Sequence, residues 1–119
     1  RLNIWDTSGQ ERYRSLIKGF YRNAEIALLV LDIHSAESLE ELRYWATELQ
    51  RNTQCMPVTA IACNKCDVRP EQRVIDMREV LAFADTIGTR IVMDTSAKDD
   101  TSAARRRHCR VNLSRSRAD

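Results

Sequence analysis

The chain has 119 residues, 43% hydrophobic and 30% charged, which is typical of one globular domain and too short for two. No apolar run approaches the roughly 20 residues that a membrane-spanning helix needs. Residues 1–98 carry 13 Lys and Arg against 14 Asp and Glu, whereas residues 99–119 carry 6 Arg against 3 Asp. The formal net charge of +2 therefore belongs to the tail, and a domain-wide nucleic-acid surface is not supported.

The first half of the chain alternates strand-like runs with a helical pattern. Leu2 and Ile4 predict a strand that ends at Asp6, and a loop follows over residues 9–14. Residues 26–31 form a continuous apolar run that ends at Asp32, the pattern of a strand buried on both faces. Ser35 is a suitable N-cap for the next helix. Its apolar residues recur at helical spacing: Leu39, Leu42, Ala46 and Leu49.

The second half continues the alternation. Residues 58–63 and 91–93 predict two further buried strands. Between them, Asp76 and Glu79 resemble a capping box and Gly88 is a suitable helix stop. The order predicts an α/β fold, a parallel sheet with helices on its faces. After Lys98 the pattern ends, so we expect a domain over residues 1–98 and a basic, disordered tail over residues 99–119.

Three polar strings follow predicted strands. They are Trp5–Glu11 (WDTSGQE), Asn64–Asp67 (NKCD) and Thr95–Lys98 (TSAK). Ligands of parallel α/β sheets bind beyond the carboxyl ends of the strands, where we expect all three strings to lie. A C-x-x-C pair, Cys63 and Cys66, overlaps the second string. We interpret it as a strand end with free thiols, because no second ligand pair accompanies it.

The second string suits recognition of guanine. A carboxylate such as Asp67 accepts hydrogen bonds at two oxygens, and guanine offers two adjacent donors, which adenine does not. Lys65 can lay its aliphatic stem over the base while its ammonium stays in water. Asn64 would join neighbouring loops by hydrogen bonds. Taken alone, the string also fits an ordinary surface turn, since Asn and Asp are common turn residues.

The third string would complete the base site. The small residues Ser96 and Ala97 allow backbone N–H groups to approach the guanine carbonyl oxygen, and Lys98 could cover the other face of the base. Alone, this string also fits an ordinary loop.

Together the three strings resemble the nucleotide site of a small GTPase of the Ras superfamily. Four flanking segments resemble the Rab branch: residues 2–5, 12–16, 20–24 and 29–33. The resemblance covers residues 1–98. It implies a partial P-loop NTPase (small G protein) fold in which the first strands and the last helix are missing.

The resemblance also implies roles on the phosphate side, with GTP or GDP and Mg²⁺ as cofactors of the complete protein. Asp6 would hold Mg²⁺ through a water molecule, and the backbone N–H of Gly9 would meet the γ-phosphate. Gln10 would be the catalytic residue that orients the attacking water. Trp5, Tyr13 and Phe20 would form a surface for effectors and regulators, although packing in the core is the alternative for the aromatic residues.

Several parts of the family pattern are not found in this sequence, namely the glycine-rich phosphate loop, switch I and the prenylated cysteines. The missing first strand would lie between the strands ending at Asp6 and Asp32, so we expect an unstable chain with no tight GTP binding. The predicted function is a Rab-like GTPase that binds and hydrolyses GTP as a switch in vesicle trafficking, in the cytoplasm at the cytosolic face of endomembranes. Its partners would be exchange factors, GTPase activators and effectors, without nucleic acid. The alternative is a truncated, non-catalytic module that presents switch II to regulators.

Overall fold

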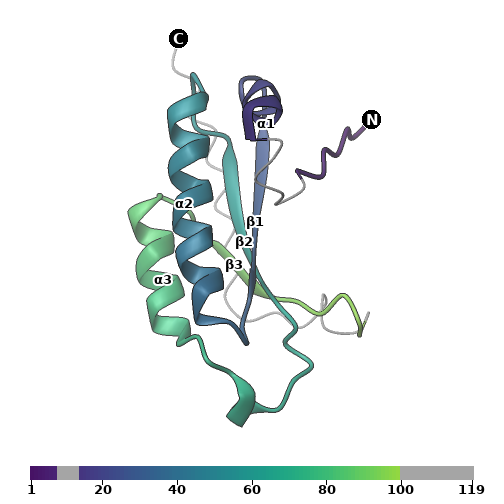
Figure 1. Ribbon diagram of the computed structural model, residues 1–119, viewed down its shortest axis with the longest axis vertical. Coiled ribbons are helices and arrows are strands. Elements are labelled where there is room, and N and C mark those ends of the chain that lie inside the picture. Colours follow the sequence, from purple (N-terminus) through teal and green to yellow (C-terminus); the bar gives the residue numbers. More distant parts are fainter. Residues whose placement is uncertain (8–13, 100–119) are drawn as a thin grey trace.

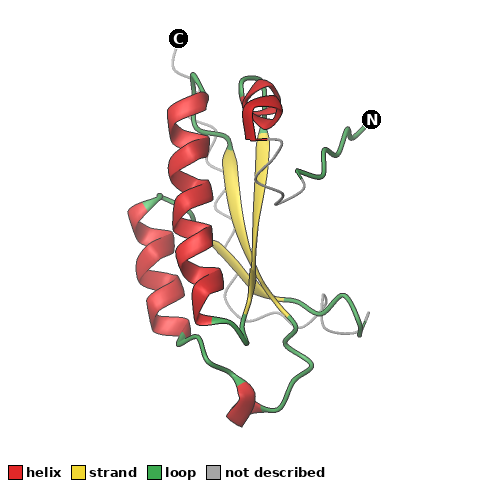
Figure 2. Ribbon diagram, viewed as in Figure 1, coloured by secondary structure: helices red, strands yellow, loops and turns green. Residues whose placement is uncertain are grey.

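The computed structural model describes residues 1–7 and 14–99. In chain order these residues form helix α1 (Arg14–Tyr21), strand β1 (Ile26–Asp32), helix α2 (Ala36–Asn52), strand β2 (Val58–Asn64), the 3₁₀ helix η2 (Pro70–Gln72), helix α3 (Met77–Thr86) and strand β3 (Ile91–Asp94). The strands form one parallel sheet in the order β1-β2-β3. The predicted α/β class with a parallel sheet is confirmed (Figures 1 and 2).

The helix boundaries follow from local chemistry. Ser35 occupies the N-cap of α2, although its side chain makes no capping hydrogen bond. The Asp76 carboxylate caps α3 by accepting a hydrogen bond of 2.9 Å from the backbone N–H of Arg78. Gly88 follows the end of α3 with φ of 72°, a left-handed conformation that costs glycine little because it has no Cβ.

The core lies between the sheet and the two long helices. Leu31 and Ile61 from the strands, Leu42 from α2 and Val80 from α3 are each at most 2% exposed. Both helices lie on the same side of the sheet in Figure 1. Within residues 1–7 and 14–99, no helix has the length and apolar character required to cross a bilayer.

The opposite face of β1 is open, which corrects the prediction of a strand buried on both faces. Leu29 and Leu31 are buried, but the alternating residues Ile26, Leu28 and Val30 are more than half exposed. Among the described residues no helix covers that face, so only the face of β1 that packs against the helices is shielded from water. Strand β3, predicted as buried, is also half-exposed, because it is a short strand at the other edge of the sheet.

The strand predicted to end at Asp6 is not formed. Residues 1–7 have no regular structure, and Leu2 and Ile4 are 73% and 81% exposed. A strand persists only where a neighbour satisfies its backbone groups, and no described strand lies beside this segment. The Rab resemblance places another strand between this segment and β1, and the described residues contain none. Instead, the Trp5 ring stacks on Phe20 of α1, with centroids 4.6 Å apart.

Candidate functional site

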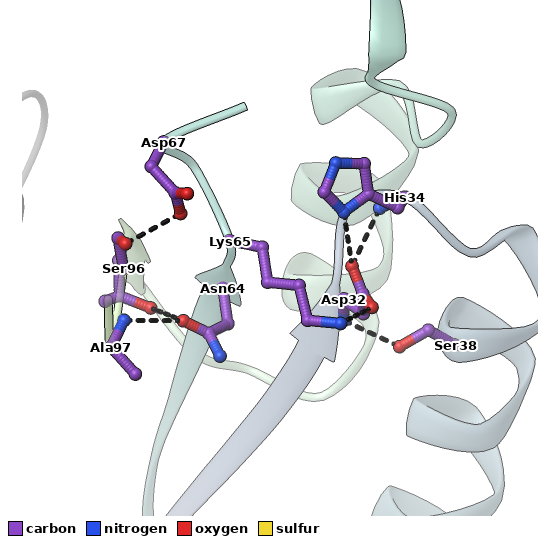
Figure 3. Close-up of polar contacts among 9 residues, drawn as sticks. Asp32, His34, Ser38, Asn64, Lys65, Asp67, Ser96 and Ala97 are labelled. Atoms are coloured by element: carbon purple, nitrogen blue, oxygen red, sulfur yellow. Dashed lines mark hydrogen bonds and ion pairs between the residues drawn. The ribbon is translucent and has the colours of Figure 1, made fainter. Parts of the chain in front are cut away.

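The sheet register brings two of the three predicted strings together. Asp32 is the β1 partner of Asn64, and Cys63 is the β2 partner of Asp94, so the three strands end at one edge. The loops beyond β2 and β3 are joined by backbone hydrogen bonds, from Thr95 N–H to the Cys63 carbonyl at 2.8 Å and from Cys66 N–H to the Thr95 carbonyl at 3.0 Å. Residues 64–67 and 95–98 thus lie side by side (Figure 3).

Asn64 connects these two loops through its side chain. Its Oδ1 accepts a hydrogen bond from the Ala97 backbone N–H at 3.3 Å and one from the Thr95 hydroxyl at 3.5 Å. The Ala97 N–H, which the sequence assigned to a guanine carbonyl oxygen, is therefore engaged by Asn64 in this structure. A base that used this donor would have to compete with Asn64 for it.

Asp67 and Ser96 form the second connection. The Ser96 hydroxyl donates to Asp67 Oδ1 at 2.7 Å, and Ser96 Oγ accepts from the Asp99 N–H at 3.0 Å. The hydrogen bond from Ser96 lowers the pKa of the Asp67 carboxyl, and the positive charge of Lys98 contributes in the same direction. Ser96 is buried and Asp67 is exposed. The site therefore offers a fixed, ionised acceptor to solvent.

Lys65 has an unusual backbone conformation between these residues. Its φ of 66° lies in the left-handed region, which few non-glycine residues adopt. Its ammonium lies 2.5 Å from Asp32 Oδ2 at the end of β1, and both side chains are drawn in Figure 3. Lys98 is exposed at the end of the third string.

Asp32 and the residues around it form a further cluster that the three polar strings do not include. Asp32 Oδ1 accepts the His34 backbone N–H at 2.9 Å and lies 3.2 Å from His34 Nδ1. The Asp32 N–H donates to the Ser38 hydroxyl at 2.8 Å. One signal in the sequence could have identified Asp32, because it ends an apolar strand just as Asn64 does.

The phosphate-side residues are not assembled with the base-side residues. Asp6 belongs to the irregular N-terminal segment, which lies near α1 and away from the carboxyl ends of the strands in Figure 1. The structure does not bring Asp6 to that edge, because the strand before it does not form, and its role in holding Mg²⁺ stays a prediction. Gly9, Gln10 and Tyr13 lie outside the described residues.

Asp6, the predicted Mg²⁺ residue, is exposed in the irregular N-terminal segment. No group of three or more His, Cys, Asp or Glu side chains that could hold a metal occurs within residues 1–7 and 14–99. The C-x-x-C pair has free thiols: Cys63 is buried, and burial raises its pKa to about 11, while Cys66 is half-buried. The two loops thus bring together one carboxylate acceptor, Asp67, and two exposed lysines, Lys65 and Lys98.

Comparisons with known proteins identify the family of this chain. The family model described as the Ras family matches residues 1–106. The chain is 44% identical over 98 residues to the GTP-binding protein ypt5 of Schizosaccharomyces pombe, and 40% identical over 97 residues to the Ras-related protein Rab-5B of Dictyostelium discoideum. Each alignment covers 82% of this chain. The chain therefore belongs to the Ras family of small GTPases and is of the Rab type within it.

The chain spans slightly less than half the length of these relatives. The alignments cover 46% of ypt5 and 44% of Rab-5B. The three-stranded sheet with its flanking helices is accordingly a partial small-GTPase fold.

Proposed function

We propose that this chain carries the guanine-recognition end of a Rab-type GTP switch. The observation that carries the proposal is the pairing of the two loops: Ser96 holds Asp67, and Asn64 holds Ala97. Guanine would place its two adjacent donors on the Asp67 carboxylate, and Lys65 and Lys98 would supply aliphatic cover. Adenine lacks this donor pair, so the arrangement selects guanine.

We further propose that the complete protein binds GTP and GDP with Mg²⁺ and hydrolyses GTP as a switch in vesicle trafficking. Residues 1–98 would be part of its GTPase domain, and residues 99–119 would be a basic tail. Sequence resemblance supports the roles of Gln10 in orienting water, Gly9 in meeting the γ-phosphate and Asp6 in holding the metal. Exchange factors, activators and effectors are its proposed partners, at the cytosolic face of endomembranes.

The stacked aromatic pair supports the proposed regulator surface. Trp5 and Phe20 are 66% and 42% exposed although their rings are in contact. Such a pair offers a rigid apolar anchor to a partner, since large aromatic side chains dominate protein interfaces. We propose that regulators and effectors contact it, together with Tyr13.

Base selectivity in the chain itself tests the guanine proposal. Amide shifts in NMR spectra would be followed during titration with GMP, AMP or XMP, because millimolar affinities can be measured in this way. We expect saturable shifts of residues 64–67 and 95–98 with GMP and none with AMP. Asp67→Asn replaces one acceptor oxygen by a donor, so GMP affinity should fall about tenfold or more and XMP, whose C2 carbonyl accepts, should bind better.

The matched control is Asp85→Asn, which removes the same charge from an exposed position on α3. It should leave the GMP titration unchanged. Equal shifts with GMP and AMP, or an Asp67→Asn variant that binds GMP like the wild type, would overturn the proposal. A fluorescent GTP analogue should bind this chain no more tightly than GMP, because the described residues supply no phosphate cradle.

A further inference from the structure

The end of β1 contacts the candidate base site through one ion pair. The parallel register places Asp32 beside Asn64, which brings the next residue, Lys65, within reach of the Asp32 carboxylate. Lys65 Nζ lies 2.5 Å from Asp32 Oδ2, although the two residues are 33 positions apart in the sequence. The left-handed φ of Lys65 belongs to the same arrangement, since the backbone conformation sets the direction in which the side chain leaves the strand end.

Asp32 is itself held in place by its neighbours. Its Oδ1 accepts the backbone N–H of His34, and its own N–H donates to Ser38 at the start of α2. The hydrogen bond from Lys65 and then the one from His34 lower the pKa of the Asp32 carboxyl. The carboxylate is therefore ionised and fixed at neutral pH, whereas an isolated lysine side chain samples many rotamers.

We propose that Asp32 is a positioning residue that holds the Lys65 ammonium at the end of β1, so that the lysine stem is ready to cover a guanine ring bound at Asp67. The inference rests on the proposed guanine site and adds a residue from a third strand to it. If the Lys65 stem is already ordered, base binding does not have to order it, so less conformational entropy is lost on binding. The contact also engages the lysine ammonium at Asp32, which leaves the Asp67 carboxylate of the same string as the acceptor that guanine needs.

Lysine NMR signals report this contact directly. The chain contains three lysines, Lys18, Lys65 and Lys98, so selective ¹³C,¹⁵N-lysine labelling gives three side-chain signals, and Lys65→Arg assigns one of them. In the wild type, the Lys65 ammonium signal should exchange more slowly than those of the other lysines and should shift when GMP is added. Asp32→Asn keeps the oxygen that accepts the His34 N–H but removes the charge, so the slow exchange of Lys65 should be lost.

Affinity for GMP is the second measurement. We expect Asp32→Asn to weaken GMP binding about two- to fivefold, the range that corresponds to an exposed ion pair. Asp32→Glu restores a carboxylate and should bind GMP within about twofold of the wild type by the same reasoning. Asp85→Asn again controls for the charge change and should leave both measurements unaffected.

A double-mutant cycle separates positioning from general destabilisation. Lys65→Met keeps an aliphatic stem but no ammonium, so Asp32→Asn should have no further effect on GMP affinity in that background. An equal loss in both backgrounds, or an unchanged Lys65 signal in Asp32→Asn, would overturn the inference while leaving the guanine proposal intact. If the wild type shows no guanine-selective binding, both proposals are wrong.

Discussion

Replacing two leucines on opposite faces of β1 should have very different effects on stability. Leu31 is 1% exposed and Leu28 is 61% exposed, although they belong to the same strand. Leu31→Ala removes buried carbon and leaves a cavity, so the free energy of unfolding should fall by about 2–5 kcal/mol. Leu28→Ala removes a side chain that is only partly shielded from water and creates no cavity. The free energy of unfolding should therefore fall by about 1 kcal/mol or less.

Urea unfolding followed by far-UV circular dichroism and by tryptophan emission measures both values. Trp45 is half-buried against the core and reports its loss. Because Leu31→Ala should cost several times more free energy of unfolding than Leu28→Ala, it should move the urea midpoint strongly and Leu28→Ala only slightly. Equal losses for the two variants would refute the conclusion that the sheet is covered on one face only.

Two further predictions concern the α3 cap and the thiols. Asp76→Ala should lower the free energy of unfolding by about 0.5–2 kcal/mol, because the backbone N–H of Arg78 in the first turn of α3 loses its acceptor. Urea unfolding measures this loss. The control Asp85→Ala, at an exposed α3 position outside the cap, should lower the free energy of unfolding by less. Iodoacetamide at pH 8 should modify the exposed Cys55 while Cys63 stays unmodified until urea unfolds the chain, because burial holds the Cys63 pKa at about 11. Mass spectrometry of the peptides measures this order, and early modification of Cys63 in the native chain would contradict its burial.

Helix boundaries and buried strand runs could be predicted from the sequence, because residues close together in the chain determine them. Helix α3 begins after Asp76 and ends before Gly88, as the cap residues indicated. The apolar runs before Asp32 and Asn64 are parallel strands, and their pairing follows from the helix that connects them. These features depend on contacts between residues a few positions apart, or on the single β1–α2–β2 connection. Apolar periodicity and capping residues are therefore sufficient to predict them.

The predictions for β1 and for the segment ending at Asp6 were wrong, because burial and pairing of a strand depend on residues far away in the sequence. A continuous apolar run such as that of β1 fits a strand covered on both faces, and the run does not specify whether a second layer is present. The segment ending at Asp6 has a strand-like pattern without a neighbour to pair with. At the base site, the strings predicted Asp67 and Lys65 as candidates, but the role of Asp32 required the register between two strands.

The parallel register has a consequence for how the base site forms during folding. Ile26 pairs with Val58 and Asp32 with Asn64, so every β1–β2 pair joins residues 32 positions apart. No pair can form early from neighbours in sequence, because each closes a loop of the same length that contains the whole of α2. Asp32 therefore meets Lys65 only after the β1–α2–β2 unit has closed, and a variant that slows this closure should delay the base site together with the sheet.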